Sequence, residues 1–216
     1  SDVCSSDLVR FVSALVSSLD SAPSFASSFG RARRDDMLIC NLKILLIGGR
    51  TAEDASINIL PLAPRFPEKK WYRQGVPVIT YEYERLYPQA KTLNMLGSYL
   101  AYRKAKEQGC YDALLINHEG FMIEGTRTNF FGIKDQTLVT APDDDVLAGV
   151  TRAHVIRCAE ANGFTVTFDR IKPDQIRELD SLFITSTSSK ILPIKSIDDV
   201  ETKGISEELK RLMEVF

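Results

Sequence analysis

The chain of 216 residues lacks the long apolar runs that membrane-spanning segments need. No stretch approaches the roughly 18 consecutive apolar residues of a transmembrane helix. Near the N-terminus, residues 11–19 are interrupted by serines, which makes this stretch too weak for the apolar core of a signal peptide. We therefore predict a cytoplasmic protein that does not enter a membrane.

The sequence also contains few histidines and cysteines and has no excess of basic charge. The two histidines, His118 and His154, show no metal-ligand spacing, and the four cysteines form neither a CxxC pair nor a disulfide framework. The formal net charge of -2 provides no basic field for nucleic acid. Nucleotide binding lacks its usual signature, because there is no Walker motif and no GxGxxG. These absences argue against a metal site and against a nucleic-acid partner.

The N-terminal segment does not resemble native protein sequence. Residues 2–8 match one reading frame of a common sequencing adapter, so we interpret residues 1–8 as translated adapter and exclude them from the fold prediction. Residues 13–34, rich in serine and alanine, carry little periodicity. We assign residues 9–90 to the remnant of a small N-terminal α+β domain and residues 91–216 to a larger domain.

Periodicity and turn residues predict an α+β fold with a mainly antiparallel sheet. Leucines at helical spacing predict a helix over residues 93–106, and a second helix is predicted over 150–162, where Gly163 ends it. Pro173 begins a short helix over 173–179, and Ser206 caps the last one. Strands are predicted where β-branched and aromatic residues cluster, at 42–47, 57–60, 76–83, 113–117, 121–124, 129–133, 137–140, 165–168, 182–185 and 191–194.

Two short polar motifs carry groups for amine chemistry. The first, Lys91-Thr-Leu-Asn, precedes a predicted helix, and the second, Glu124-Gly-Thr-Arg-Thr-Asn, ends an apolar strand. A lysine can hold an aldehyde as an imine and then move a proton. A carboxylate can keep a pyridine nitrogen protonated. Taken alone, each residue is more often a solvated surface group.

Two further motifs suit a phosphate group. Gly149-Val-Thr-Arg opens a helix, where free backbone N–H groups, the helix dipole and the Thr151 hydroxyl favour an anion. Thr185-Ser-Thr-Ser-Ser follows an apolar strand and gathers five hydroxyls in one loop. Alone, these would be an ordinary helix cap and a polar linker. Together, the four motifs predict a site for pyridoxal phosphate, which needs an imine partner, a partner for the ring nitrogen and donors for a phosphate.

In this order and at these spacings, the motifs resemble those of the class IV, or fold type IV, pyridoxal-phosphate enzymes. That family includes branched-chain and D-amino-acid aminotransferases and aminodeoxychorismate lyase. The resemblance runs from about residue 41 to residue 216. It implies an α+β protein with two mixed or antiparallel-sheet domains, the small N-terminal one being incomplete here, and it makes residues 91–216 the cofactor-binding domain.

The resemblance also assigns site residues. Lys91 would be the catalytic lysine that binds the cofactor, and Glu124 would pair with the ring nitrogen. The other cofactor-binding residues that it implies are Leu147, Val150, Thr151, Ser186 and Thr187. Arg10 is the candidate for the arginine that the small domain donates to the phosphate.

The function that the resemblance implies is transamination between an amino acid and a 2-oxo acid, with branched-chain L-amino acids as the preferred prediction. A D-amino-acid aminotransferase, 4-amino-4-deoxychorismate lyase, an inactive truncated remnant and a cofactor-free domain stay open as alternatives. Tyr83, Arg85 and Ser188 are predicted substrate contacts. Arg127 could meet an acidic substrate group, although a solvated arginine is the commoner case. A homodimer is also implied.

Overall fold

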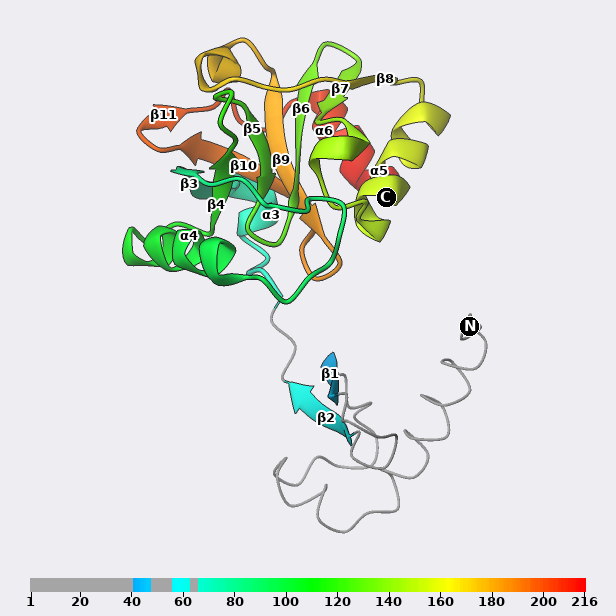
Figure 1. Cartoon of the computed structure of the whole chain (residues 1–216). Helices are drawn as coiled ribbons and strands as arrows, with labels where there is room; N and C mark the ends of the chain where they lie inside the picture. The colour runs from blue at the N-terminus through cyan, green and yellow to red at the C-terminus, as the bar shows by residue number, and fades with distance from the viewer. Residues whose placement is uncertain (1–40, 48–55, 63–65) are drawn as a thin grey trace. The chain divides into compact units, whose positions relative to one another are not determined.

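A computed structural model describes residues 41–47, 56–62 and 66–216 (Figure 1). The chain divides into two compact units, residues 1–64 and 65–216. In the first unit, β1 (Asn41–Ile47) and β2 (Ser56–Leu62) form an antiparallel pair, as two of the predicted strands. The interpretations of residues 1–8, Arg10 and residues 13–34 lie outside the described residues.

The predicted boundary between residues 90 and 91 falls within the second unit. There, β3 (Val76–Glu82) pairs in parallel with both β10 (Lys190–Ile197) and β4 (Asp112–Ile116). A strand that the sequence prediction assigned to the small domain therefore belongs to the sheet of the larger unit. Its inward residues Val76 and Val78 are fully buried, which explains why it packs there.

Six strands of the second unit close into a mixed barrel. The order is β3, β4, β5 (Met122–Gly125), β6 (Asn129–Lys134), β9 (Ser181–Ser186) and β10, which returns to β3. Apart from the two parallel pairs of β3, the pairings around the barrel are antiparallel. The predicted antiparallel hairpins are confirmed, whereas the closure of the sheet was not predicted. β7 (Thr137–Thr140), β8 (Thr165–Phe168) and β11 (Val200–Glu201) extend the sheet beyond the barrel.

Helices cover the outside of this barrel (Figure 1). α4 (Leu96–Glu107) lies on one side, and α5 (Val150–Ala161) and α6 (Glu207–Val215) lie on the other. These are the three longer predicted helices. Pro173–Arg177 is a short 3-10 helix, and a second one, Asp143–Asp145, was not predicted, nor was the four-residue α3 (Trp71–Gln74). Elements this short carry too little periodicity to be predicted from sequence.

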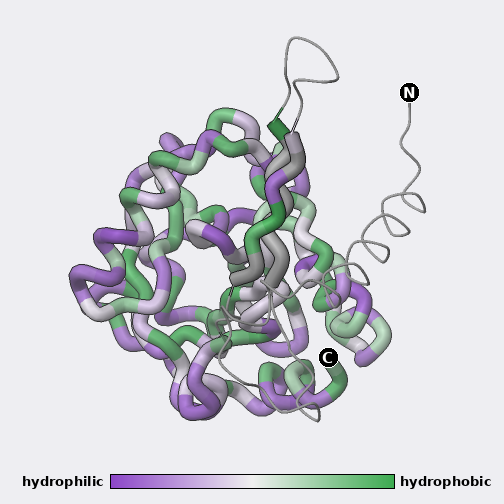
Figure 2. The backbone as a smooth tube through the Cα atoms, turned by 90° about the horizontal axis from the view of Figure 1, so that it is seen from below, coloured by the Kyte–Doolittle hydropathy of each residue, from purple (hydrophilic) through white to green (hydrophobic). Residues whose placement is uncertain are grey.

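The last helix shows how sequence pattern becomes packing. The Ser206 hydroxyl accepts a hydrogen bond from the Leu209 N–H at 3.3 Å, which is the N-cap predicted from the sequence. Leu209 and Leu212 are fully buried, while Lys210 and Arg211 are exposed. Figure 2 shows this alternation of hydrophobic and hydrophilic residues in the helix beside the C-terminus. α6 thereby buries its apolar face against the sheet.

Alternate residues of β6 and of β9 enter separate cores on the two faces of the sheet. Phe130 and Ile184 face a cluster with Val78 and Leu114, and their neighbours Phe131 and Phe183 face α5 and α6. The rings of Phe131 and Phe183 stack with their centroids 4.9 Å apart. Because the strands are packed on both faces, the residues at their ends are held in fixed positions. In the part of the chain that the structure describes, no helix has the length and apolar character to span a bilayer.

Candidate cofactor site

Three of the predicted cofactor residues line one cavity of about 280 Å³. Lys91 lies in the segment before α4, Glu124 near the end of β5, and Leu147 in the loop before α5. The volume is close to the lower bound of roughly 300 Å³ that is typical of ligand pockets. The structure therefore brings the lysine, the carboxylate and the leucine to the same cavity.

Glu124 is held at both carboxylate oxygens. Only 5% of the residue is exposed; Oε1 accepts from Arg85 Nη1 at 2.8 Å, and Oε2 accepts from the Leu147 N–H at 3.4 Å. Burial raises the pKa of Glu124, while the bond and charge of Arg85 and the Leu147 N–H oppose that rise. The net direction is upward. The orientation of the side chain is thus fixed, and its pKa depends on Arg85.

Arg85 was predicted to contact substrate, and the structure shows it engaged with protein groups. Besides Glu124, its guanidinium donates to the carbonyl oxygens of Ala90 at 2.6 Å and Tyr87 at 3.4 Å. It thereby ties Glu124 to the segment that carries Lys91. Tyr83 lies with Arg85 and Glu124 at a second cavity of about 100 Å³, and it does not line the cavity of Lys91. Substrate contacts of Tyr83 and Arg85 stay predictions.

The first phosphate motif forms the start of α5. The N-cap is Gly149, which provides no side-chain cap, and the first turn holds no acidic residue. The first N–H groups of a helix have no partner within it, so they are suited to an anion. Val150 is 84% exposed and Thr151 is half-buried. This end of the helix has the donors that the sequence motif predicted.

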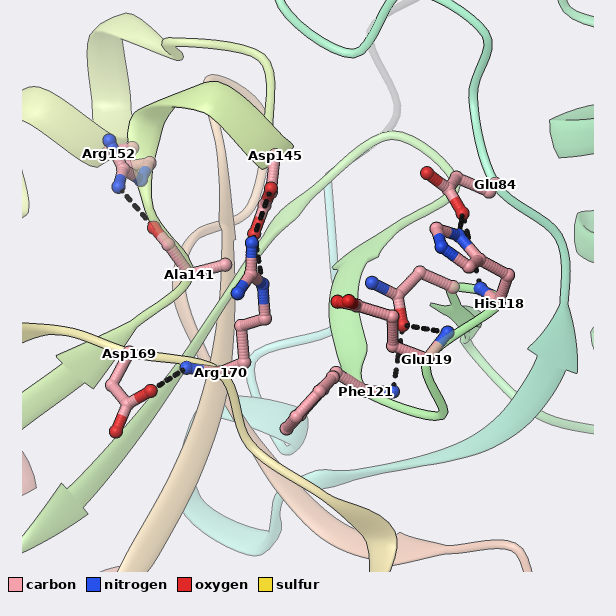
Figure 3. A network of polar contacts seen from close by, with 10 residues as sticks. Glu84, His118, Glu119, Phe121, Ala141, Asp145, Arg152, Asp169 and Arg170 are labelled. Carbon is pink, nitrogen blue, oxygen red and sulfur yellow. Dashed lines mark hydrogen bonds and ion pairs between the residues drawn. The ribbon is translucent and has the colours of Figure 1, made fainter.

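The loop in front of α5 is anchored by two arginines. Arg152, only 3% exposed, donates to Asp143 Oδ1 at 2.5 Å. It also donates to the Ala141 carbonyl at 2.7 Å, the bond drawn in Figure 3. Arg170 donates to both oxygens of Asp145, at 2.6 and 3.1 Å. Figure 3 shows the Arg170 guanidinium directed at that carboxylate. These bonds fix the segment that leads to Leu147.

The second phosphate motif is the turn between β9 and β10. Thr187 and Ser188 are exposed there. The Ser186 hydroxyl contacts Ser189 Oγ at 2.7 Å and Ser188 Oγ at 3.3 Å, and it accepts from the Ser189 N–H at 3.1 Å. Ser186 therefore shapes the turn, which leaves the hydroxyls of Thr187 and Ser188 at the surface. The substrate contact predicted for Ser188 stays a prediction.

Asn129 connects the two phosphate motifs. It lies opposite Thr185 in the β6–β9 register, and its Nδ2 donates to the Leu147 carbonyl at 3.0 Å. A side chain at Gly149 would collide with Asn129 Oδ1, so only glycine allows this close approach. The sequence prediction quoted Asn129 within a motif but assigned it no role. Its position as the last residue of the polar motif that begins with Glu124 could have marked it as a site residue.

The donor set fits pyridoxal phosphate. Within the described residues, the buried side-chain polar atoms without a hydrogen-bond partner are Arg152 Nε and Thr185 Oγ1, and each belongs to one of the two phosphate motifs. Buried polar atoms are normally paired, so unpaired ones call for an explanation such as a bound group. The cavity adds a primary amine from Lys91 and the held carboxylate of Glu124.

Asp112 holds the backbone and hydroxyl groups next to this cavity in place. This role was not predicted from the sequence. Asp112 is 1% exposed; Oδ1 accepts from the Thr126 hydroxyl at 2.5 Å and the Ala113 N–H at 2.9 Å, and Oδ2 accepts from the Thr128 hydroxyl at 2.9 Å. A Cβ at Gly125 would lie 2.7 Å from Asp112 Oδ2. Burial raises the pKa of Asp112, against the effect of these bonds. A single Asp at a strand start offers no sequence signal for this role.

Replacing Asp112 with alanine is expected to lower the free energy of unfolding by about 2–4 kcal/mol, because several buried donors lose their acceptor. Urea denaturation followed by circular dichroism measures this change. The matched control is Asp199→Ala, since Asp199 is exposed and makes no side-chain hydrogen bond within the described residues; its effect should stay within about 0.5 kcal/mol. Equal losses in both variants would contradict a supporting role for Asp112.

Comparison with known families identifies the class of protein. Residues 24–197 match the family model described as amino-transferase class IV. The chain belongs to this family. Two solved relatives, both T.th. branched-chain amino acid aminotransferases, contain N-(5'-phosphopyridoxyl)-L-glutamate and pyridoxamine 5'-phosphate. The described part of the chain contains no group of three or more His, Cys, Asp or Glu residues that is arranged to hold a metal ion.

Individual relatives agree with this assignment. A D-alanine aminotransferase of Listeria monocytogenes is 40% identical over 131 residues, which is 59% of this chain and 45% of the relative. The T.th. branched-chain amino acid aminotransferase, complexed with N-(5'-phosphopyridoxyl)-L-glutamate, is 30% identical with a TM-score of 0.58, over 65% of this chain and 50% of that one.

The Escherichia coli branched-chain amino acid aminotransferase matches with a TM-score of 0.64 over 74% of this chain and 55% of that one. Because the identity is 23%, this match supports the fold, fold type IV, and nothing beyond the fold. The chain spans about half the length of the relatives that it matches.

Proposed function

We propose that this chain carries out pyridoxal-phosphate-dependent transamination between an amino acid and a 2-oxo acid. The observation that carries the proposal is the cavity shared by Lys91 and Glu124 in a chain of the class IV family. Asn129 links that cavity to both phosphate motifs through Leu147 and Thr185. No nucleic acid or membrane partner is part of this function.

When bound, pyridoxal phosphate supplies an aldehyde and an electron-withdrawing ring. Lys91 Nζ would be the amine that holds the cofactor; once the substrate amine replaces it there, the freed Nζ would move the proton at the substrate Cα. Glu124 would accept a hydrogen bond from the protonated ring nitrogen and so favour that protonated form. The cofactor phosphate would be held by the start of α5 at Val150 and Thr151 and by the β9–β10 turn at Ser186 and Thr187.

Arg85 has a positioning role in this proposal. Its charge 2.8 Å from Glu124 favours the ionised carboxylate, against the effect of burial. Its bonds to the Ala90 and Tyr87 carbonyls hold the segment before Lys91. Arg85 thus holds Glu124 directly and the backbone next to Lys91, the two groups that would act on the cofactor.

Branched-chain L-amino acids are the proposed amino donors. More of the strongly matching relatives carry a branched-chain aminotransferase name than a D-alanine aminotransferase name. D-amino acids are the second candidate, since the 40% identical relative is a D-alanine aminotransferase. 4-Amino-4-deoxychorismate is a third candidate substrate, and its use would make the chain a lyase, which does not transfer the amino group.

An ultraviolet-visible spectrum of the purified chain with pyridoxal phosphate tests the function. We expect a visible band from the lysine-bound cofactor, and that band should bleach with L-leucine, while D-alanine and 4-amino-4-deoxychorismate serve as the competing substrates. Bleaching by one of the others reassigns the substrate. Absence of a band with excess cofactor would instead support the inactive-remnant alternative.

We also propose that the chain forms a homodimer. The start of α4 and the segment before it carry exposed apolar residues: Leu93 (84% exposed), Leu96 (67%) and Tyr99 (58%). Several such residues close together form an apolar surface patch, whereas a single exposed one does not. A second copy of the chain is the expected partner for this surface. Sedimentation velocity should give a dimer, and Leu96→Glu should shift it toward monomer; an unchanged sedimentation coefficient in that variant would place the interface elsewhere.

A further inference from the structure

Arg127 lies at the boundary between two adjacent cavities. One is the cavity of Lys91 and Glu124, and the other, of about 520 Å³, is lined mainly by apolar and aromatic residues before and along α4. Arg127 and Thr126 line both. A charged side chain at this boundary lies within the same cavity as the groups proposed to hold the cofactor.

The backbone on either side of Arg127 is fixed. Thr126 donates to Asp112 through its hydroxyl at 2.5 Å and its N–H at 3.3 Å, and the Thr128 hydroxyl donates to the other Asp112 oxygen at 2.9 Å. Both threonines are buried, while Arg127 between them is exposed. The buried carboxylate therefore anchors the loop and leaves the arginine side chain on its outer side.

The guanidinium of Arg127 is also held in place. Its Cζ lies 4.4 Å from the centroid of the Tyr102 ring on α4, within the range of a cation–π contact. Among the described residues it forms no ion pair and no side-chain hydrogen bond, in contrast to Arg85 and Arg152, which are bonded to Glu124 and Asp143. Its hydrogen-bond donors are thus available to a ligand in a pre-organised orientation.

We propose that Arg127 binds a carboxylate of the substrate and that Tyr102 positions it. This inference rests on the proposed transaminase function. Amino acids and 2-oxo acids carry a carboxylate, which a guanidinium binds with two parallel hydrogen bonds. Two other cations line the cavity: Lys91 is the proposed cofactor lysine, and Arg85 is already bonded to Glu124. The carboxylate is either the one on Cα or, in a glutamate-like substrate, the one on the side chain.

The test measures ligand binding as well as activity. Wild type, Arg127→Gln, Arg127→Lys and Tyr102→Leu are loaded with pyridoxal phosphate, and borohydride reduction with mass spectrometry checks the load on Lys91. Calorimetry then gives the Kd of 4-methylvalerate, which has one carboxylate, and of glutarate, which has two. Arg103→Gln is the matched control, because Arg103 is an exposed arginine on α4 that pairs with Glu107.

We expect Arg127→Gln to weaken binding roughly tenfold, the low end for a hydrogen bond to a charged group. KM for the substrate should rise more than kcat falls, Arg127→Lys should restore part of the affinity, and Tyr102→Leu should lose less than Arg127→Gln. Weaker binding of both acids assigns Arg127 to the Cα carboxylate, and weaker binding of glutarate alone assigns it to the side-chain carboxylate. Arg103→Gln should leave both Kd values unchanged.

Two results would overturn the proposal while the function stands: unchanged Kd values in Arg127→Gln, or a changed sedimentation coefficient that assigns Arg127 to a subunit contact. A wild-type chain that carries no pyridoxyl group on Lys91 would overturn the proposed function, and this inference with it. The mass spectrum therefore separates the two failures.

Discussion

Replacing Lys91 with alanine should lower kcat/KM for amino-group transfer by at least about 10,000-fold. The variant loses both the amine that bonds to the cofactor and the group that moves the proton at the substrate Cα. Positioned proton transfer alone is worth about 100- to 10,000-fold, and the covalent contribution adds to it. Quantifying the 2-oxo acid product by chromatography measures the loss. Borohydride reduction followed by mass spectrometry should find a pyridoxyl group on Lys91 in wild type and none in the variant.

The matched control for Lys91 is Lys104→Ala. Lys104 is exposed on α4 and does not line the cavity, so its loss should leave activity and cofactor attachment within about twofold of wild type. A pyridoxyl group on another lysine, or full activity in Lys91→Ala, would refute the assignment. A circular dichroism spectrum of Lys91→Ala that matches wild type separates lost chemistry from lost fold.

Most elements of the larger unit could be predicted from local pattern. Strands rich in β-branched and aromatic residues, such as β3 and β6, and helices with clear stop signals, such as α5 before Gly163, lie where the sequence indicates. The closure of the barrel could not be predicted in the same way. It depends on β9 pairing with β6 about fifty residues earlier in the chain, and such a pairing leaves no local signal.

The site likewise contains residues that the sequence could predict and contacts that it could not. Lys91 and Glu124 come from the sequence motifs and Leu147 from the family resemblance, and the three line one cavity. Asp112 and the engagement of Arg85 with Glu124 were not predicted, because each depends on which residues of other segments lie nearby. The domain boundary was hard to place for a related reason. β3 precedes the lysine motif in sequence, yet it pairs with strands that follow that motif.

Replacing Glu124 with glutamine should lower kcat by about 100- to 1,000-fold, the range found when one group that stabilises developing charge is removed. The amide still fits the space between Arg85 and the Leu147 N–H, but it is neutral and no longer favours a proton on the ring nitrogen. The Kd for pyridoxal phosphate, measured by fluorescence quenching, should rise less than kcat falls. The matched control is Glu119→Gln, because Glu119 is an exposed glutamate in the turn before β5.

The pH profile tests the same carboxylate through its arginine. Burial raises the pKa of Glu124, and Arg85 opposes that rise, so Arg85→Met should raise this pKa further. The carboxylate then takes up its proton at a higher pH, so kcat/KM should begin to fall at a higher pH as the solution is made more acidic. We therefore expect the acid limb of the kcat/KM profile to move to higher pH in Arg85→Met and to disappear in Glu124→Gln, which has no carboxylate to titrate. An acid limb that stays at the same pH in all three proteins would show that another group controls it, and it would remove Arg85 from the role of holding Glu124 ionised.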